Sequence, residues 1–226
     1  MAVGLIYRHT LIYESAMFVL YGRHYFSRYR AIADLVAPRT SVLDVCCGPA
    51  ILYDRYLRHK PVDYLGLDIN AGFIKRLIRR GGRGTVWDLR RDEPLPRADY
   101  VIMQASLYHF LPDPRPVLNR MVEAACNQVI IAEPVRNLAQ TRWPALASFA
   151  RVLTDAGTGR QPRRFTERSL DELLAGLSLP VRRAFLISGG REKIYVIDKD
   201  CRQAMSDASR QQKNFMSGTA CSLAHS

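Results

Sequence analysis

An acidic residue and a loop of small residues stand in the first apolar segment after Pro38. Residues 42–50 read VLDVCCGPA, with Asp44 in the apolar run and Gly48 in the loop that follows. A second acidic residue, Asp68, comes twenty positions after Gly48. In parallel α/β units such a loop lets a ligand approach the backbone closely, and the later carboxylate binds ribose hydroxyls. The spacing therefore predicts a nucleoside-binding unit.

Further polar residues follow the later apolar runs. They are Asp88 after residues 84–87, Gln104 after residues 100–103 and Glu133 after residues 128–132. Parallel α/β sheets bind ligands at the carboxyl ends of their strands, so Glu133 is a candidate for facing the substrate. His109 is a candidate general base because its ordinary pKa is near neutrality. The alternatives are a loop cap or packed ring for His109, a solvent-exposed turn for Asp88, and a cap or partner of Arg136 for Glu133.

The elements that would position these residues alternate between strands and helices, as in parallel βαβ units. We expect strands at Ser41–Val45, Asp63–Leu67, Gly84–Trp87, Tyr100–Met103 and Gln128–Ala132, and helices near Ile51–Leu57, Ala71–Arg80 and Pro116–Ala125. A further helix is predicted from Thr166, a suitable N-cap, to Leu177. The pattern predicts an α/β fold with a doubly wound, Rossmann-like sheet and helices on both faces.

The end of this alternation is an antiparallel hairpin. Val181–Ser188 and Lys193–Asp198 are β-rich runs joined by a Gly-Gly-Arg-Glu sequence. A Rossmann oxidoreductase would be expected to end on a parallel strand. Five alternating strands with a terminal hairpin instead resemble the seven-stranded fold of class I S-adenosylmethionine (SAM) dependent methyltransferases of the small-molecule type. The resemblance covers residues 41–199 and implies SAM as the cofactor.

The resemblance gives roles to residues in the first two motifs. The family's first motif usually reads acidic-x-Gly-x-Gly-x-Gly and passes beside the methionine part of SAM. Asp44, Cys46 and Gly48 occupy matching positions here. Asp68 matches the carboxylate that holds both ribose hydroxyls, and Ile69 would then lie against the adenine ring.

Later motifs match as well. The resemblance implies that Asp88 contacts the adenine amine and that the backbone amide of Leu89 faces a ring nitrogen. Gln104 would flank the cofactor near its sulfonium. Tyr108 and His109 belong to a Leu-x-His-Phe sequence that is similar to the family's, and they would lie near the substrate.

Two of the three motif glycines are replaced, by Cys46 and Ala50. Because a Cβ atom disfavours positive φ, we expect the loop to avoid positive φ at both positions. Adjacent cysteines at a strand end are interpreted as packed thiols and not as nucleophiles.

Composition narrows the classes of function. The chain has 226 residues and five cysteines without a CxxC pair, so neither a disulfide framework nor a zinc site is predicted, and the histidines show no metal-ligand spacing. The longest apolar stretch, Leu11–Tyr21, is about half the length that crosses a bilayer. No secretion signal is recognised, and the expected location is cytoplasmic. A net charge of +12 points to an anionic partner.

Three parts of the chain are expected. Residues 1–38 form a helical lid segment, residues 39–200 form the methyltransferase domain, and residues 201–226 form a disordered tail. Within the domain, an arginine-rich insertion at residues 136–165 would also cover the pocket.

The leading interpretation is methyl transfer from SAM to a small acceptor that is anionic or lipid-linked, since arginine-rich lids favour anionic substrates. In-line displacement at a sulfonium needs alignment more than catalytic groups. The alternatives are RNA methylation, prompted by the net charge of +12; peripheral membrane contact, prompted by the apolar and basic residues 11–30; and a non-catalytic protein of the same fold. The acceptor atom and the oligomeric state stay open.

Overall fold

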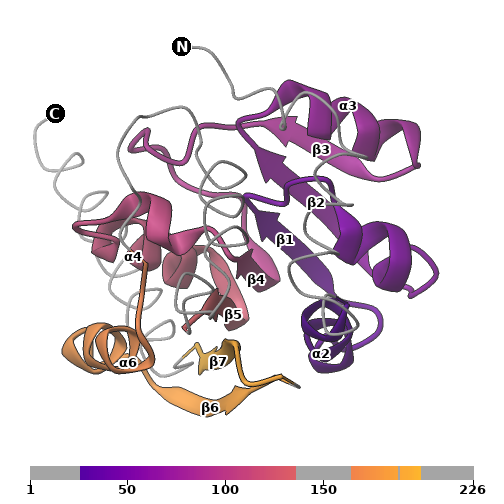
Figure 1. Cartoon of the computed structure of the whole chain (residues 1–226). Coiled ribbons are helices and arrows are strands. Elements are labelled where there is room, and N and C mark those ends of the chain that lie inside the picture. Colours follow the sequence, from indigo (N-terminus) through magenta and orange to yellow (C-terminus); the bar gives the residue numbers. More distant parts are fainter. Residues whose placement is uncertain (1–25, 136–163, 188, 200–226) are drawn as a thin grey trace, which may run out of the picture.

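A seven-stranded sheet forms the centre of the computed structural model, which describes residues 26–135, 164–187 and 189–199 (Figure 1). Its strand order is β3-β2-β1-β4-β5-β7-β6. The strands are β1 (Ser41–Val45), β2 (Asp63–Asp68), β3 (Arg83–Val86), β4 (Ala98–Gln104), β5 (Ala125–Pro134), β6 (Val181–Leu186) and β7 (Glu192–Asp198). The first five are parallel to one another, whereas β7 is antiparallel to both β5 and β6. The predicted doubly wound sheet with a terminal hairpin is confirmed.

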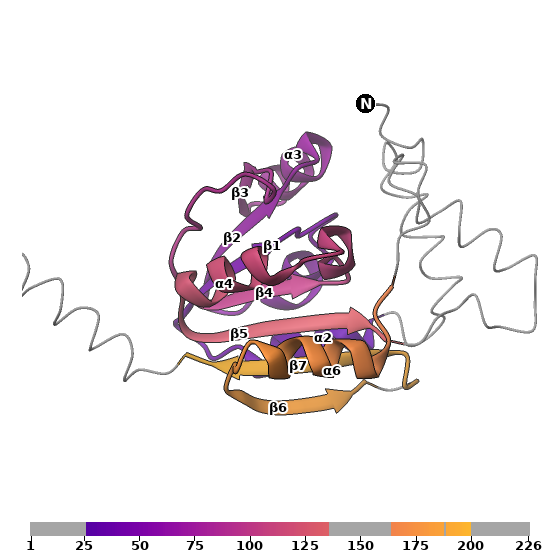
Figure 2. The same cartoon turned by 90° about the vertical axis from the view of Figure 1, so that its left-hand side faces the viewer.

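Helices cover both faces of this sheet (Figure 2). One face carries α2 (Ser27–Leu35), the turn η3 (Tyr53–Leu57) and α3 (Ala71–Arg79), and the other carries α4 (Arg115–Ala124) and α6 (Glu167–Gly176). Side chains of a strand alternate between the faces: in β4, Ile102 packs in the first layer, and Val101 and Met103 pack in the second. Burial on both faces explains why the central strands are continuous apolar runs.

Local signals start two of the helices. The side chain of Asn70 accepts a hydrogen bond of 2.8 Å from the amide of Gly72 and so caps α3. At α6, the Thr166 hydroxyl accepts from the Ser169 amide at 3.1 Å, and the Ser169 hydroxyl accepts from the Thr166 amide at 2.9 Å. This reciprocal pair is a capping box, and the predicted N-cap at Thr166 is confirmed.

Some boundaries differ from the prediction. β5 begins at Ala125, three residues earlier than expected, because α4 ends at Ala124 and the next residue is already extended. The helix expected near residues 51–57 is present, but its second part is a single π-helical turn in which the Arg58 amide donates to the Tyr53 carbonyl at 2.8 Å. A short 3₁₀ turn, η4 (Leu107–Phe110), follows β4.

Two glycines form the turn of the hairpin. Gly189 and Gly190 have φ values of 98° and 64°. The Gly190 amide donates to the Ile187 carbonyl at 2.8 Å, and the Ile187 amide donates to the Glu192 carbonyl at 3.0 Å. A backbone with two consecutive positive φ angles suits residues without a Cβ atom, which explains the Gly-Gly pair.

Several expectations concern residues outside the described ranges. They are the part of the lid segment before residue 26, nearly all of the insertion at residues 136–165 and the tail at residues 201–226. Among residues 26–135, 164–187 and 189–199, no helix is both long enough and apolar enough to span a membrane.

Candidate functional site

Four polar side chains gather at the carboxyl edge of the parallel strands. Asp44, Asp68, Gln104 and Glu133 come from the neighbouring strands β1, β2, β4 and β5. All four are buried, and the exposed fraction of Asp44 and Glu133 is 0%. Charged side chains are rarely buried so deeply unless they have partners or a function. This edge is therefore the candidate site, as the sequence predicts.

Asp44 lies at the centre of the cluster. Its carboxylate accepts a hydrogen bond of 2.8 Å from the Tyr64 hydroxyl and a longer one of 3.3 Å from Nε2 of Gln104. Burial raises the pKa of Asp44 to about 7, more than these two hydrogen bonds lower it. Because Nε2 of Gln104 faces a carboxylate, Oε1 must point elsewhere; it is buried and accepts no hydrogen bond within the described part of the chain.

Asp68 ties the small-residue loop to β2. One carboxylate oxygen accepts from the Gly48 amide at 2.8 Å, and the other accepts from the Asn70 amide at 2.8 Å. The Cys47 amide also donates to the Leu67 carbonyl at 3.0 Å. Burial raises the pKa of Asp68, while its two backbone hydrogen bonds act in the opposite direction. The carboxylate predicted to bind ribose thus lies directly beside the loop.

The backbone of the loop corrects one prediction. We expected positive φ to be avoided at Cys46 and Ala50, but their φ values are 56° and 57°, close to the 55° of Gly48. Such a conformation costs a residue with a Cβ atom about 1–2 kcal/mol. The hydrogen bonds to Leu67 and Asp68 hold the loop in this shape in spite of that cost.

The loop leaves room beside its one glycine. A Cβ atom added to Gly48 would meet no atom within 4 Å. The neighbouring thiols are unsuited to nucleophilic chemistry, because burial raises the pKa of both Cys46 and Cys47. Their interpretation as packed thiols agrees with this.

Apolar side chains flank Asp68 at the ends of β2 and β3. Ile69 and Val86 have exposed fractions of 54% and 52%. Leu89 is buried in the core, so that only its backbone is available to a ligand. Asp88 forms a turn in which one carboxylate oxygen accepts from the Arg90 amide at 3.0 Å. The positions predicted for adenine contacts therefore combine apolar surface with a partly open carboxylate.

Glu133 holds β5 to the turn after β4. Its Oε1 accepts from the amides of Ser106 and Leu107 at 2.6 and 2.7 Å, so it caps the start of η4. Its Oε2 is buried without a hydrogen-bond partner among the described residues. Burial raises the pKa of Glu133 to about 7. The alternative that Glu133 acts as a cap is correct for one oxygen, and the second oxygen is left for another partner.

Tyr108 and His109 lie on η4 beside an arginine from the end of the insertion. The rings of Tyr108 and His109 have centroids 4.1 Å apart, and the guanidinium of Arg164 lies 3.7 Å from the centroid of the Tyr108 ring. His109 as a whole is exposed, although neighbouring groups cover part of its ring. Loss of water around its ring, together with the charges of Arg164 and Arg90, lowers the pKa of His109 to about 4. Its imidazole is thus neutral at physiological pH.

Sequence reasoning missed a buried arginine near this cluster. Arg28 of α2 donates from Nη1 to Glu192 of β7 and from Nη2 to the Tyr29 hydroxyl at 2.9 Å. Its positive charge also lowers the pKa values of Asp44 and Glu133. The available signal was its place four residues before Ile32, on the apolar stripe of α2.

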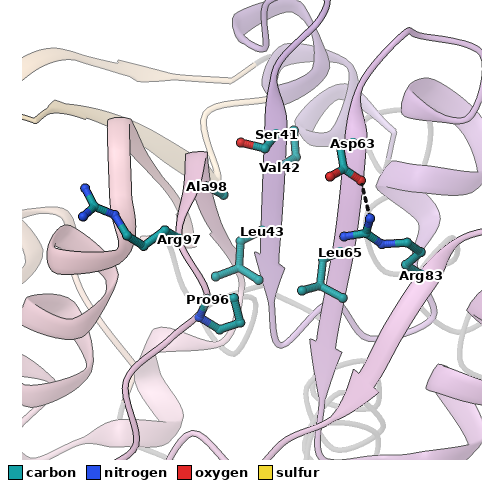
Figure 3. A pocket seen from close by; sticks show the side chains of 9 residues that line it. All are labelled: Ser41, Val42, Leu43, Asp63, Leu65, Arg83, Pro96, Arg97 and Ala98. Atoms are coloured by element: carbon teal, nitrogen blue, oxygen red, sulfur yellow. Dashed lines mark ion pairs between the residues drawn. The ribbon is translucent and has the colours of Figure 1, made fainter.

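A cavity of about 120 Å³ lies elsewhere, at the amino edge of the sheet (Figure 3). Its lining includes Ser41, Asp63, Arg83 and Ala98, which are the first residues of β1 to β4. Asp63 and Arg83 form an ion pair of 2.8 Å there. Because parallel α/β sheets bind ligands at the opposite edge, we do not assign the site to this cavity.

The carboxyl edge fits a SAM-like ligand. The buried Oε1 of Gln104 lacks the donor that an ammonium group would supply. The open space beside Gly48 allows close approach to the backbone, and Ile69 offers apolar surface for a ring. Donors, acceptors and apolar groups are thus present where the resemblance requires them.

Solved structures show the same fold. The chain is similar to magnesium protoporphyrin IX methyltransferase from Synechocystis PCC 6803 with bound SAH (TM-score 0.61, 13% identity, 86% of this chain and 96% of that one). It is also similar to a TehB-like SAM-dependent methyltransferase from Corynebacterium glutamicum (TM-score 0.58, 17% identity, 83% and 95%). A third similar structure is the Haloferax volcanii complex with the Trm112 methyltransferase activator (TM-score 0.64, 12% identity, 88% and 99%). No curated protein sequence matches the chain.

A family model gives the more specific result. It is described as methionine biosynthesis protein MetW and matches residues 27–156, which is more than half of the chain. The matched stretch contains β1 to β5 and the four buried polar residues of the carboxyl edge. The chain therefore belongs to the MetW family and has the fold of the class I SAM-dependent methyltransferases.

Proposed function

We propose that the carboxyl edge binds SAM and that the protein transfers the cofactor's methyl group to a small anionic acceptor. The observation that carries this proposal is the hydrogen bond from the Gly48 amide to Asp68. It joins the loop that has open space beside it to the carboxylate that we propose binds ribose. In the proposed complex, Oε1 of Gln104 accepts from the ammonium of the cofactor's methionine part.

Asp68 keeps binding capacity for a ribose. A carboxylate has about four acceptor sites, and the amides of Gly48 and Asn70 occupy two of them. The remaining two suit a pair of vicinal hydroxyls. Ile69 and Val86 then provide apolar surface for the adenine ring, in agreement with their exposure at the strand ends.

The chemistry requires positioning more than acid–base catalysis. Bound SAM would supply a methyl group on a sulfonium, whose leaving group is already activated. The protein's part is to align this group with the acceptor, to exclude water and to bind the positively charged cofactor. The buried carboxyl groups of Asp44 and Glu133 serve the last purpose in their ionised form.

Arg164 supports an anionic acceptor. Its guanidinium lies over the Tyr108 ring and has no carboxylate partner among the described residues. An arginine in this position suits a carboxylate or phosphate, to which it donates two parallel hydrogen bonds. The family description, methionine biosynthesis, also favours a small carboxylate because amino-acid precursors carry one. We propose that the insertion at residues 136–165 and the segment at residues 1–38 flank this acceptor.

Calorimetry tests the cofactor. Titration with SAM, with its product S-adenosylhomocysteine (SAH) and with NAD separates this function from that of a dehydrogenase. We expect binding of SAM and SAH and no binding of NAD. A protein that binds NAD alone, or none of the three, contradicts the proposal.

Kinetics test the acceptor. Arg164→Gln should raise the KM for an anionic acceptor about tenfold and leave SAM affinity unchanged. The matched control is Arg168→Gln, which removes an exposed arginine that is paired with Glu172 on α6. Equal KM values for Arg164→Gln and the wild type would remove the argument for an anionic acceptor.

A further inference from the structure

The loop after β3 is irregular and yet carries two of the residues proposed to contact adenine. Residues 87–97 form neither helix nor strand. Asp88 lies at the start of this loop, and the side chain of Leu89 anchors it in the core. A contact made from such a loop is only as well placed as the loop itself.

A single side chain from the neighbouring helix holds the loop from outside. Arg120 of α4 donates from Nη2 to the carbonyl of Leu89 and from Nη1 to the carbonyl of Arg91. Nη1 also reaches the carbonyl of Glu93 at 3.4 Å. The planar guanidinium thereby spans three carbonyls that are spaced two residues apart along the chain. A lysine, with one nitrogen, does not match this arrangement.

The same loop is fixed internally at Asp88. One oxygen, Oδ1, accepts from the amide of Arg90 at 3.0 Å and lies 3.3 Å from Nε of that residue. The Arg91 amide donates to the Asp88 carbonyl at 3.0 Å, which closes the turn. Oδ2 makes no hydrogen bond within the described residues and is free to accept one. The carbonyl of Arg91, at the end of this turn, is bound by Arg120.

We propose that Arg120 is a positioning residue that holds Oδ2 of Asp88 in place to accept a hydrogen bond from the exocyclic amine of the cofactor's adenine; this rests on the function proposed above. Arg120 acts through the loop and does not touch the ligand. Its effect is therefore on discrimination between purine bases more than on binding in general. A base with an oxygen in place of the amine would put two acceptors face to face and be rejected.

The test compares SAH with S-inosylhomocysteine, in which an oxygen replaces the exocyclic amine and the adjacent ring nitrogen carries a proton. The wild-type protein should bind SAH at least about thirtyfold more tightly. Arg120→Met should reduce this ratio about fivefold or more by weakening SAH binding, because the turn at Asp88 is no longer held. Arg120→Lys, which keeps the charge and the stem, should give an intermediate ratio, and it provides the readout if the methionine variant does not fold.

Controls distinguish positioning from general stabilisation. Arg115→Met removes an exposed arginine from the same helix, which is paired with Asp113, and should leave the ratio unchanged. A purely structural role of Arg120 would lower the melting temperature and weaken both ligands equally, and this outcome overturns the inference. The effects of Asp88→Ala and Arg120→Met should also be less than additive. If the wild-type protein binds neither ligand, the proposed function itself fails.

Discussion

The two edges of the parallel sheet both carry acidic side chains, but these differ in burial and in their hydrogen-bond partners. At the amino edge, Asp63 pairs with Arg83 in an exposed ion pair. Asp99 accepts hydrogen bonds of 2.8 Å from both the amide and the hydroxyl of Ser41. The acids at this edge therefore have partners within the protein or from solvent.

At the carboxyl edge the acids are deeply buried, and two polar atoms lack hydrogen-bond partners among the residues that the structure describes. Glu133 Oε2 and Gln104 Oε1 accept no hydrogen bond within the described ranges. Of the non-glycine residues with positive φ in the described ranges, Cys46, Ala50 and Ala105 lie at this edge, whereas Arg39 precedes β1 at the amino edge. Unsatisfied groups and backbone strain are costly, and proteins concentrate both where they bind ligands.

The comparison teaches that a cavity is a poorer guide to function than buried polar atoms without hydrogen-bond partners. The cavity of about 120 Å³ lies at the amino edge, where the acids already have ion-pair or hydrogen-bond partners. The carboxyl edge has the unsatisfied groups that a ligand would complete. Four experiments test this contrast.

The largest difference in ligand affinity is expected between substitutions at the two ends of β2. Asp68→Ala, at the end of β2, should weaken SAH binding about 100-fold or more, because it removes two charged acceptor positions for ribose. Asp63→Ala, at the start of the same strand, should change the affinity less than about twofold. Calorimetry on both variants measures the difference. Equal losses would mean that the two edges do not differ in function.

The buried acids of the carboxyl edge should make the free energy of unfolding depend on pH. The pKa of Asp44 is about 7 in the folded protein, against an ordinary value of 3.8, so the folded state binds the extra proton between these values. Stability should therefore fall as the pH rises from about 4 to 7. In Asp44→Asn this fall should be smaller by about 3 kcal/mol.

Urea unfolding at several pH values measures this slope. Glu133→Gln offers a second test, since the pKa of Glu133 is also about 7. If the free energy of unfolding changes with pH from 4 to 8 by the same amount in the wild type and in both variants, burial of these acids does not reduce stability.

A smaller effect on stability is expected from relief of the backbone strain at Ala50. Ala50→Gly relieves a φ of 57° and loses one buried methyl group, so its stability should equal or exceed the wild type by up to about 1 kcal/mol. Ala33→Gly, a buried alanine within α2, loses a methyl group without relief and should cost about 1–2 kcal/mol. Thermal unfolding measures both. If Ala50→Gly is the more destabilising, the loop is not strained.

The smallest effect is expected at His109, on the rim of the carboxyl edge. Because its pKa is lowered from 6.5 to about 4, its imidazole is a weak base. His109→Gln should lower kcat less than about tenfold, and any limb of the pH–rate profile between pH 6 and 7, where Asp44 and Glu133 titrate, should be the same in the variant as in the wild type. A limb at that pH that is lost in the variant would restore the role of general base.

Regular elements could be predicted because their causes are local. The bounds of β1 were predicted without error, since an apolar run begins after Pro38 and Thr40 and ends at small residues. The hairpin was predicted from its two glycines. The start of β5 was placed too late because Ala125 has high helix propensity, and pairing with β4 overrides it.

Features of the site that depend on distant partners could not be predicted. The positive φ of Cys46 and Ala50 contradicts the local preference of both residues and is maintained by hydrogen bonds to the end of β2. The pairing of Arg28 with Glu192 joins residues that are 164 positions apart. No local pattern contains such information. The roles given to the predicted site residues stay predictions until ligand binding is measured.

The separation of Arg28 from Glu192 also has a consequence for biosynthesis. A ribosome that adds about 5–20 residues per second needs roughly 10–30 s to make the intervening 164 residues. During that time β1 to β5 are already synthesised, but Arg28 has not met its partner from β7. The nascent chain therefore carries the charge of Arg28, at a position that is later buried, before Glu192 has been made. Antiparallel insertion of β7 beside β5, the last pairing along the chain, neutralises this charge and completes the active fold.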